Sequence, residues 1–169
     1  MKKFELTAEF VTNVFGKKLF RIKALVAFGN VEKGELGGFI EKEDNLSHDG
    51  DAWVYGNAQV SGDALVSGNA RVSGNARVYG DAWVYGNAQV SDDADYAVVK
   101  GFGRCFRTTT FFRCKDKILR VQCGCFYGDL AQFREIVKKT HGDSKYAKEY
   151  LAIADLMELH FSDECGGEQ

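Results

Sequence analysis

The sequence contains no proline and no long apolar run, and its positive and negative charges nearly cancel. A helix that spans a bilayer needs about 20 apolar residues in succession, so a membrane protein is not expected. The formal net charge of −2, from 22 basic and 24 acidic residues, argues against a chain whose whole surface binds nucleic acid. Glu5 and Glu9 interrupt any signal-peptide core at the N-terminus. We therefore expect a soluble cytoplasmic protein.

The cysteines do not form an even set. The five cysteines, an odd number, fit a reducing compartment better than a framework of disulfides. By contrast, 45% of the 169 residues are hydrophobic and 13% are aromatic, which is enough to build the core of one ordinary domain or two small ones. This composition excludes disorder as the main state of the chain.

A six-residue repeat runs without interruption from Gly50 to Ser91, as GDAWVY GNAQVS GDALVS GNARVS GNARVY GDAWVY GNAQVS. Each hexad has glycine, then Asp or Asn, alanine, a variable residue, valine, and finally Ser or Tyr. A helix of period 3.6 cannot keep such a pattern on one side. Glycine followed by Asn or Asp suits corners that need a positive φ.

The array resembles the hexapeptide repeat of left-handed parallel β-helices, in which three hexads form one triangular coil of 18 residues. The resemblance implies that one valine of each hexad points inward beside a small alanine. These positions are Val54, Val60, Val66, Val72, Val78, Val84 and Val90, with Ala52, Ala58, Ala64, Ala70, Ala76, Ala82 and Ala88. Seven hexads make little more than two coils, so such a short prism needs caps.

Residues 18 apart would stack on the outside of the prism, for example Trp53 over Arg71 over Gln89. These outward rows are more apolar than a solvated face requires, which predicts a surface covered by another subunit or segment. We expect this partner surface to include Trp53, Arg71, Tyr79, Trp83 and Tyr85. A homo-oligomer, trimer or dimer, would cover them; the other interpretation is ordinary amphipathic side chains on a thin prism.

The flanking segments complete a mainly β fold. Residues 1–49 are expected to form a β-rich N-terminal cap, residues 50–91 the short left-handed parallel β-helix, and residues 92–169 an α+β module. In that module, segments 96–101, 104–113 and 118–123 have the pattern of three strands, and two amphipathic helices follow, giving the order βββαα. Gly142 is expected to end the first helix.

Several segments carry a second resemblance. LFRIKAL, KGELGGFIEKEDNLS, RTTTFFR and CGCFYGDLAQF, together with the array, are similar to small uncharacterised phage and prophage proteins, some of which are described as polymer-forming. The resemblance implies an accessory role in a bacterial host cell, such as interference with bacterial defence, and assigns no chemistry to any residue. We therefore predict a non-catalytic binding or assembly protein, without a cofactor, that occupies a host defence protein or sequesters a nucleotide signal.

Enzymatic alternatives remain open at this point. Acyltransferases of the hexapeptide type need a histidine base, but the array contains no histidine and His48 precedes it. A small hydrolase or transferase could instead use Cys123 or Cys125 as nucleophile and His141 as base. The simpler interpretation of His141 is a cation that stabilises the C-terminus of a helix.

The cysteines also allow a metal-site alternative. Cys105, Cys114, Cys123 and Cys125, or three of them with His141, supply the ligand types of a tetrahedral zinc site. Their spacing is unfavourable, because eight residues separate Cys105 from Cys114. The other interpretation is that they are small buried residues in a reducing cell.

The segment from Lys100 to Arg120 holds seven basic residues and one acid, Asp116, and four phenylalanines are interleaved with them. Basic and aromatic side chains that alternate on strands are typical of surfaces that bind phosphates and stacked bases. We expect the contacts to come from Arg104, Arg107, Thr109 and Arg113. In the competing interpretation, phenylalanine simply points inward and arginine outward on half-buried strands.

Overall fold

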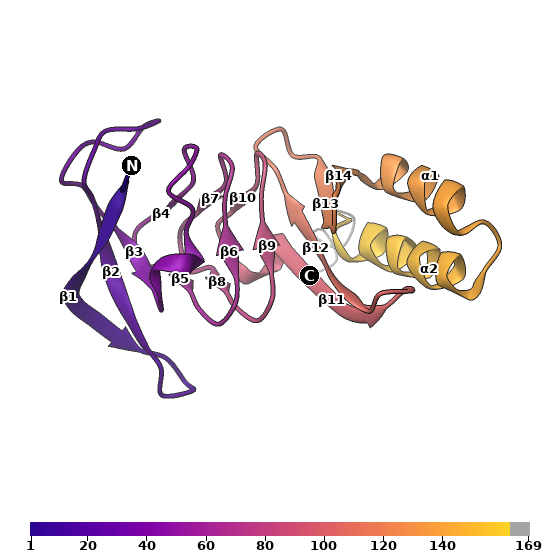
Figure 1. The fold of residues 1–169 in the computed structure, drawn as a ribbon, viewed down its shortest axis with the longest axis horizontal. Coiled ribbons are helices and arrows are strands. Elements are labelled where there is room, and N and C mark those ends of the chain that lie inside the picture. Colours follow the sequence, from indigo (N-terminus) through magenta and orange to yellow (C-terminus); the bar gives the residue numbers. More distant parts are fainter. Residues whose placement is uncertain (163–169) are drawn as a thin grey trace, which may run out of the picture.

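The computed structural model describes residues 1–162, which form three parts in a row (Figure 1). An antiparallel sheet lies at the N-terminal end, a stack of short parallel strands forms the middle, and an antiparallel sheet with two helices forms the C-terminal end. In the described part of the chain, no helix is long and apolar enough to cross a membrane.

The middle part is a β-solenoid in which every hexad contributes one strand of two residues. The seven strands are β4 (Trp53–Val54), β5 (Gln59–Val60), β6 (Leu65–Val66), β7 (Arg71–Val72), β8 (Arg77–Val78), β9 (Trp83–Val84) and β10 (Gln89–Val90). Strands three hexads apart pair in parallel, as β4–β7–β10, β5–β8 and β6–β9. All the valines and alanines expected to point inward are buried, so the repeat builds a continuous apolar core.

The corners of the solenoid depend on glycine. The first residue of each hexad has φ between 59° and 72°, a region that only glycine enters without strain. At Gly74, an added β-carbon would also collide with the carbonyl oxygen of Ser91 in the next coil. The glycines therefore allow both the turn of the chain and the close stacking of successive coils.

The N-terminal part extends one face of the solenoid. Strands β1 (Phe4–Thr12), β2 (Lys18–Ala24) and β3 (Leu36–Ile40) pair antiparallel in that order. Strand β3 then pairs in parallel with β5, with Phe39 opposite Gln59. The sheet is therefore continuous with the stack, and β3 precedes the first regular hexad in it.

Trp53 is buried under this N-terminal sheet, with no exposed surface. The rings of Phe4 and Phe28 pack edge-on against it, at centroid distances of 6.4 and 5.3 Å. A β-carbon on Gly37 would lie only 2.7 Å from the indole ring. Of the two covers expected for the outward rows, another subunit or another segment, a segment of the same chain covers Trp53, which leaves this residue no surface for a partner.

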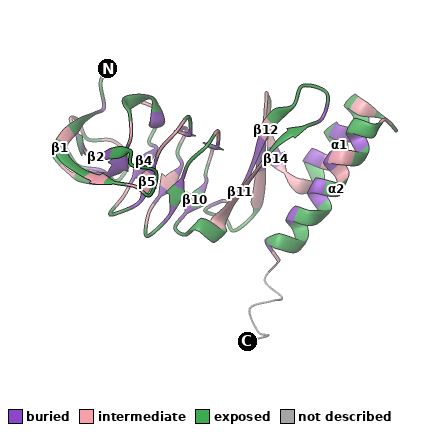
Figure 2. Cartoon of the chain, turned by 90° about the horizontal axis from the view of Figure 1, so that it is seen from below, coloured by how far each residue is buried: buried purple, intermediate pink, exposed green. Residues whose placement is uncertain are grey.

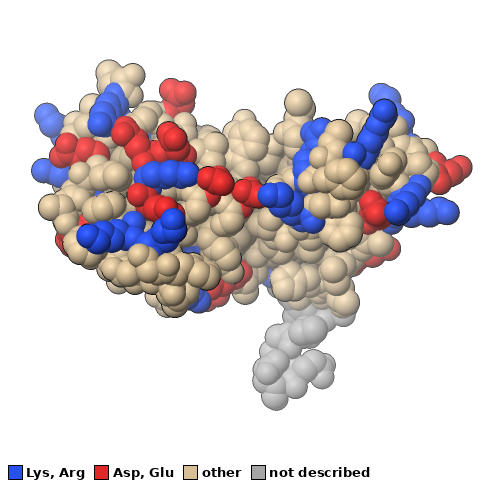
Figure 3. Space-filling view, turned by 60° about the horizontal axis from the view of Figure 1, so that its bottom comes forward, with Lys and Arg blue, Asp and Glu red and all other residues tan. Residues whose placement is uncertain are grey.

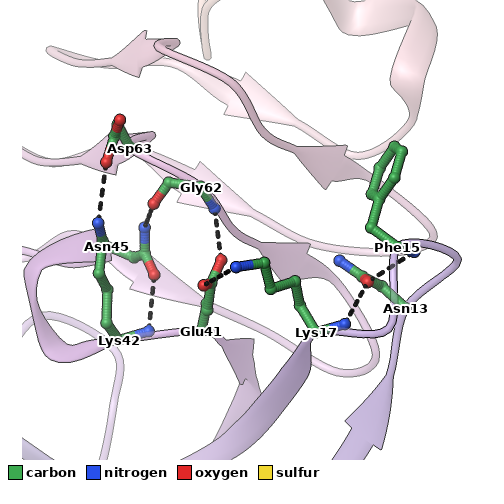
Figure 4. A network of polar contacts seen from close by, with 8 residues as sticks. All are labelled: Asn13, Phe15, Lys17, Glu41, Lys42, Asn45, Gly62 and Asp63. Atoms are coloured by element: carbon green, nitrogen blue, oxygen red, sulfur yellow. Dashed lines mark hydrogen bonds and ion pairs between the residues drawn. The ribbon is translucent and has the colours of Figure 1, made fainter.

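Polar contacts fasten the N-terminal part to the corner at Gly62 (Figure 4). The Glu41 carboxylate accepts a hydrogen bond from the backbone N–H of Gly62 at 2.8 Å. The buried Asn45, in the short 3₁₀ helix η1 (Glu43–Asn45), donates to the carbonyl oxygens of Gly62 and Ala64. Lys42 forms an ion pair with Asp63, with Nζ and Oδ1 2.9 Å apart. This network joins the end of β3 to the first coils.

The C-terminal part contains four strands rather than the expected three. After the 3₁₀ helix η2 (Asp93–Asp95), the strands are β11 (Tyr96–Phe102), β12 (Arg107–Arg113), β13 (Leu119–Cys123) and β14 (Phe126–Asp129), paired antiparallel in chain order. The fourth strand arises because Gly124, at φ 58°, allows a two-residue turn after Cys123. The expected order βββαα is therefore corrected to ββββαα.

The two helices begin and end at residues that the sequence marks. Helix α1 (Leu130–His141) is capped by Asp129, and Gly142 ends it with φ 57°. Helix α2 (Lys145–His160) begins after Ser144, whose hydroxyl accepts a hydrogen bond from the N–H of Ala147. Both helices lie on the side of the sheet that faces away from the solenoid (Figure 1).

The middle of the C-terminal sheet lies between the last coil and the helices, and β12 is its most buried strand (Figure 2). Thr109, Thr110, Phe111 and Phe112 are all buried in the middle of β12. Phe111 and Phe112 point inward and Arg107 is exposed, as the competing interpretation expects, but the middle of β12 is not a half-buried strand. Strand β12 has no solvent-facing side over these four residues, because one side contacts the solenoid and the other contacts the helices.

Candidate functional site

A groove of about 680 Å³ lies between the outside of the solenoid and the turn after β12. We call it the basic groove. It is lined by Tyr55, Arg71, Ser73, Gln89, Ser91, Arg113, Cys114, Lys115 and Lys117. Four of these nine residues are cationic and none is acidic. The groove can therefore attract an anion, and its hydroxyl and amide groups can add hydrogen bonds.

The repeat builds one wall of the basic groove. Arg71 pairs with Gln89 in the register of β7 and β10, 18 residues apart. Tyr55, Ser73 and Ser91 occupy the last position of their hexads at the same spacing and form a second row beside the first. Polar side chains of three successive coils thus face the same groove.

The turn between β12 and β13 builds the opposite wall. Cys114 forms a β-bridge with Ala88, and the N–H of Lys115 donates to the carbonyl oxygen of Asn87 at 2.9 Å. Lys117 adopts φ 68°, which is unusual for a residue with a side chain. The turn is therefore held against the solenoid by backbone contacts, and these bring both lysines to the groove.

The cations of the basic groove differ in their surroundings. Within residues 1–162, no carboxylate lies within 4.0 Å of the side-chain nitrogens of Arg71, Lys115 or Lys117. Arg113 has internal partners: its Nε lies 3.4 Å from Asp95, and its Nη2 donates to the carbonyl oxygen of Phe161 at 3.2 Å. Arg113 is thus part of the wall, and the other three cations are available to a ligand.

Two further side chains define the chemistry of the basic groove. The Arg71 guanidinium lies 5.9 Å from the centre of the Tyr55 ring, so a cation and an aromatic face are adjacent. Burial raises the pKa of the Cys114 thiol above its ordinary value, so this thiol stays protonated at neutral pH and is a poor nucleophile. The groove therefore combines cations, an aromatic ring and a protonated thiol.

A second cavity, of about 310 Å³, lies at the opposite end of β12. We call it the thiol cavity. It is lined by Arg104, Cys105, Arg107, Cys123, Cys125, Phe126, Phe133, Ile136, Val137, Thr140, His141 and Tyr150. It contains all three residues of the Cys-His alternative. The His141 ring stacks on Tyr150 at 5.9 Å, and in the described part of the chain no hydrogen bond joins it to a thiol. The structure thus shows no nucleophile–base pair.

The four residues expected to bind a ligand do not form one site. Arg104 and Arg107 line the thiol cavity, whereas Arg113 lines the basic groove. A strand rises about 3.3 Å per residue, so the two ends of the seven-residue β12 lie roughly 20 Å apart. Thr109 has no exposed surface, and its hydroxyl donates to Cys123 Sγ at 3.2 Å. The sequence identifies Lys115 and Lys117 as basic, but their proximity to Arg71 does not follow from it, because it depends on how the turn packs on the solenoid.

The basic segment is also partly neutralised. Lys100 forms an ion pair with Asp81 of the solenoid, and Arg120 forms one with Asp116. Figure 3 shows basic and acidic groups side by side across the middle of the molecule. Ion pairs there join the solenoid to the N-terminal part, through Lys42 and Asp63, and to the C-terminal part, through Lys100 and Asp81. The excess of positive charge in this segment therefore does not form one continuous surface.

The four-cysteine alternative does not assemble either. Cys114 packs with the solenoid core, while Cys105, Cys123 and Cys125 line the thiol cavity on the far end of the sheet. Within residues 1–162, no three His, Cys, Asp or Glu side chains gather as a metal-binding group. The fifth cysteine, Cys165, lies outside the described residues.

The residues expected on a partner surface have different environments. Trp83 is 37% exposed, and its Nε1 donates to Ser67 Oγ at 2.6 Å. Tyr85 packs edge-on against Tyr127 of β14, so the C-terminal sheet covers part of this row. Tyr79 is 55% exposed and remains available to a partner, and Arg71 lines the basic groove.

The repeat is similar to a known group of solenoids. A family model described as the YdcK beta solenoid repeat matches residues 58–73 and residues 70–86. No curated protein matches the chain. The matched segments lie inside the stack of parallel strands, so sequence comparison and structure agree that the middle of this protein is a β-solenoid.

Proposed function

We propose that this protein is a non-catalytic binding protein that holds a phosphate-bearing ligand, a nucleotide, in the basic groove. The observation that carries the proposal is the convergence of Arg71, Lys115 and Lys117 on one groove without an acidic lining residue. Guanidinium and ammonium groups are the side chains that bind phosphate most strongly. The Ser73 hydroxyl supplies a further donor to phosphate oxygens, whereas the Ser91 hydroxyl already donates to the Asp95 carboxylate at 2.9 Å.

Other residues of the basic groove can contact the base of a nucleotide. Tyr55 presents an aromatic ring beside Arg71, and a base can stack on such a ring. Gln89 offers an amide that can both donate and accept hydrogen bonds. The volume of about 680 Å³ lies within the usual range for small-molecule sites.

Titration of fluorescent probes tests the proposal. Labelled single-stranded DNA and a panel of linear and cyclic nucleotides are added to the full chain at low and at high salt. We expect at least one nucleotide to bind, with an affinity that falls as salt is added. Replacing both Lys115 and Lys117 with Gln should weaken binding roughly tenfold or more, because charged hydrogen bonds are lost. If no probe binds at low salt, the proposal is wrong.

The repeat offers a matched control. Arg71 and Arg77 occupy the same position of successive hexads, but Arg77 lies on another face and pairs with Asp93. Arg71→Gln should weaken nucleotide binding, and Arg77→Gln should leave it unchanged. An equal effect of the two substitutions would show that binding follows net charge and not this groove.

Sequestration of a nucleotide signal is the role we propose for such a site, in line with the accessory role that the resemblance to phage and prophage proteins implies. A sequestering protein releases its ligand unchanged, whereas an enzyme converts it. Excess nucleotide should therefore be recovered intact by chromatography after long incubation. Recovery of a product would overturn the non-catalytic part of the proposal.

We also propose that the coils of the solenoid are left-handed. The support is the hexad pattern, with an inward valine and a glycine corner every six residues, and the 18-residue spacing of paired strands. A crystal structure of the chain determines the hand directly, and right-handed coils would overturn this proposal.

A further inference from the structure

The basic groove continues past Arg71 into a smaller pocket of about 210 Å³ at a corner of the solenoid. We call it the corner pocket. It shares Arg71, Gln89 and Lys115 with the basic groove. The pocket also contains the second residues of three stacked hexads, Asp51, Asn69 and Asn87. A ligand whose anionic group lies at Arg71 and Lys115 can therefore extend into both spaces.

The repeat sets the distance between the aromatic ring of the basic groove and the corner pocket. Asp51 and Tyr55 are the second and sixth residues of one hexad, and strand β4 lies between them. At about 3.3 Å per residue, four residues separate their backbone positions by roughly 13 Å. Arg71 follows in the next coil, where it pairs with Trp53 in the middle of the same side. The cation therefore lies between the aromatic ring and the carboxylate.

The carboxylate of the corner pocket is open to a ligand. Asp51 is exposed, and within residues 1–162 its carboxylate takes part in no hydrogen bond and in no ion pair within 4.0 Å. Its backbone N–H donates to Oδ1 of Asn69 at 3.3 Å, which leaves the amide nitrogen of Asn69 as a donor. Gly29 passes close by, and a β-carbon there would lie 3.2 Å from the carboxyl carbon of Asp51. The missing side chain at Gly29 therefore keeps this carboxylate uncovered.

The corner pocket is suited to an uncharged group that donates hydrogen bonds. A carboxylate repels a second phosphate, so the anionic chain of a nucleoside triphosphate fits poorly between Arg71 and Asp51. The Asp51 carboxylate and the amides of Asn69 and Asn87 instead match the polar edge of a base. Guanine presents two neighbouring donors, N1–H and N2–H₂, which one carboxylate can accept together.

We propose that the ligand of this site is a dinucleotide that contains guanine, an inference that rests on the nucleotide-binding function proposed above. The phosphodiester lies between Arg71 and Lys115. One base stacks on Tyr55, and the guanine donates two hydrogen bonds to Asp51 in the corner pocket. A mononucleotide has one base only, so it fills one side of Arg71 and leaves the other side empty.

Calorimetric titration of the full chain at low salt compares three probes: guanylyl-guanosine (GpG), adenylyl-adenosine (ApA) and guanosine monophosphate (GMP). GpG carries one negative charge, whereas GMP carries nearly two at neutral pH, so charge alone favours GMP. We expect GpG to bind roughly tenfold or more tightly than either of the others, because GMP has a single base and ApA lacks the paired donors of guanine.

The three probes separate failure of this inference from failure of the nucleotide site. Binding of GMP as tight as that of GpG would overturn the dinucleotide and leave the nucleotide site standing. Equal binding of ApA and GpG would overturn the guanine contact. No binding of these probes or of the wider nucleotide panel would overturn both proposals.

Asp51→Asn tests the guanine contact with a change that suits the repeat, since four of the seven hexads carry Asn at this position. Removal of a negative charge by itself strengthens the binding of an anion. We expect the opposite result: GpG should bind roughly tenfold more weakly, because hydrogen bonds to a charged group are lost, and it should lose its preference over ApA.

Asp63→Asn is the matched control for this variant. It makes the same change at the same hexad position, but on another face of the solenoid, where Asp63 pairs with Lys42. This substitution should leave the affinity for GpG unchanged. Unchanged or tighter binding of GpG to the Asp51→Asn variant would overturn the proposal.

Discussion

Phe111 and Phe112 are neighbours in the chain, yet they belong to two different hydrophobic cores. Phe112 packs with the solenoid, and Phe111 packs with the helices, where its ring lies 6.0 Å from that of Phe133 in an edge-on arrangement. Successive side chains of a strand point to opposite faces of a sheet. This alternation makes β12 the element that joins the solenoid to the helical end.

Removal of either ring should destabilise a different part of the protein. Phe111→Ala and Phe112→Ala should each lower the free energy of unfolding by about 3–5 kcal/mol, because both side chains are fully buried. Hydrogen exchange should then show faster exchange in the helices for Phe111→Ala and in the last hexads for Phe112→Ala. The same exchange pattern for both variants would show that the two cores are not separate.

A substitution at Val72 can test whether the valine side chains of the repeat point into the solenoid core. It lies between Val54 and Val90 in the stacked register and has no exposed surface. Val72→Asp should unfold the solenoid, because an unpaired buried carboxylate costs several kcal/mol, which is comparable to the whole stability of a domain. Asn75→Asp, at an exposed corner where other hexads carry Asp, should leave the melting temperature nearly unchanged. A folded Val72→Asp variant with normal circular dichroism would contradict the inward direction.

Alanine substitutions at two glycine corners can distinguish the stability cost of backbone strain from that of steric collision. Gly74 and Gly80 have φ of 61° and 71°, so alanine should cost roughly 1 kcal/mol of conformational strain at either position. At Gly74 the new methyl group would also collide with the Ser91 carbonyl, whereas at Gly80 no atom lies within 4 Å. Urea denaturation should therefore show a clearly larger loss for Gly74→Ala. Equal losses would indicate that the coils do not stack as closely as described.

Lys3 should make stability depend on pH in the alkaline range. Its Nζ donates to the carbonyl oxygens of Ala52 and Gly50, and burial lowers its pKa to about 8, against the opposing effects of Asp51 and Asp49. The unfolded chain keeps this proton up to about pH 10.4. Between these values the unfolded state binds more protons, so the contribution of Lys3 to stability rises with pH.

The comparison of two lysine variants isolates this effect. Between pH 7.5 and 9.5, the free energy of unfolding of wild type should rise by about 1–2 kcal/mol relative to Lys3→Met, as follows from the lowered pKa. Lys2→Met, at an exposed neighbouring position, should follow the wild type. A difference between wild type and Lys3→Met that does not change with pH would contradict the lowered pKa.

Self-association remains a prediction from the sequence. Val14 and Phe15, at the turn between β1 and β2, are 85% and 74% exposed, and Tyr79 is 55% exposed. Light scattering after size-exclusion chromatography should give a dimer or trimer at micromolar concentration, and Phe15→Ser with Tyr79→Ser should weaken it. A strict monomer would show that these apolar side chains are simply exposed.

The repeat could be predicted from the sequence because its information is local. Every hexad repeats the same glycine corner and inward valine, so each strand of the solenoid follows from six residues and their neighbours three hexads away. The same holds for the ends of α1 and α2, where Asp129, Gly142 and Ser144 are cap residues. These features need no knowledge of the distant chain.

Tertiary structure alone decided where the two cavities lie and which residues share them. Arg71 and Lys115 are 44 positions apart in the sequence, and only the packing of the C-terminal sheet on the last coil brings both to the basic groove. Arg107 and Arg113 are close in the sequence, but an extended strand separates them and assigns them to different cavities. The hydrophobic pattern identifies the face that each short element buries, but the partner that covers it is determined by the complementary shape of the finished surfaces.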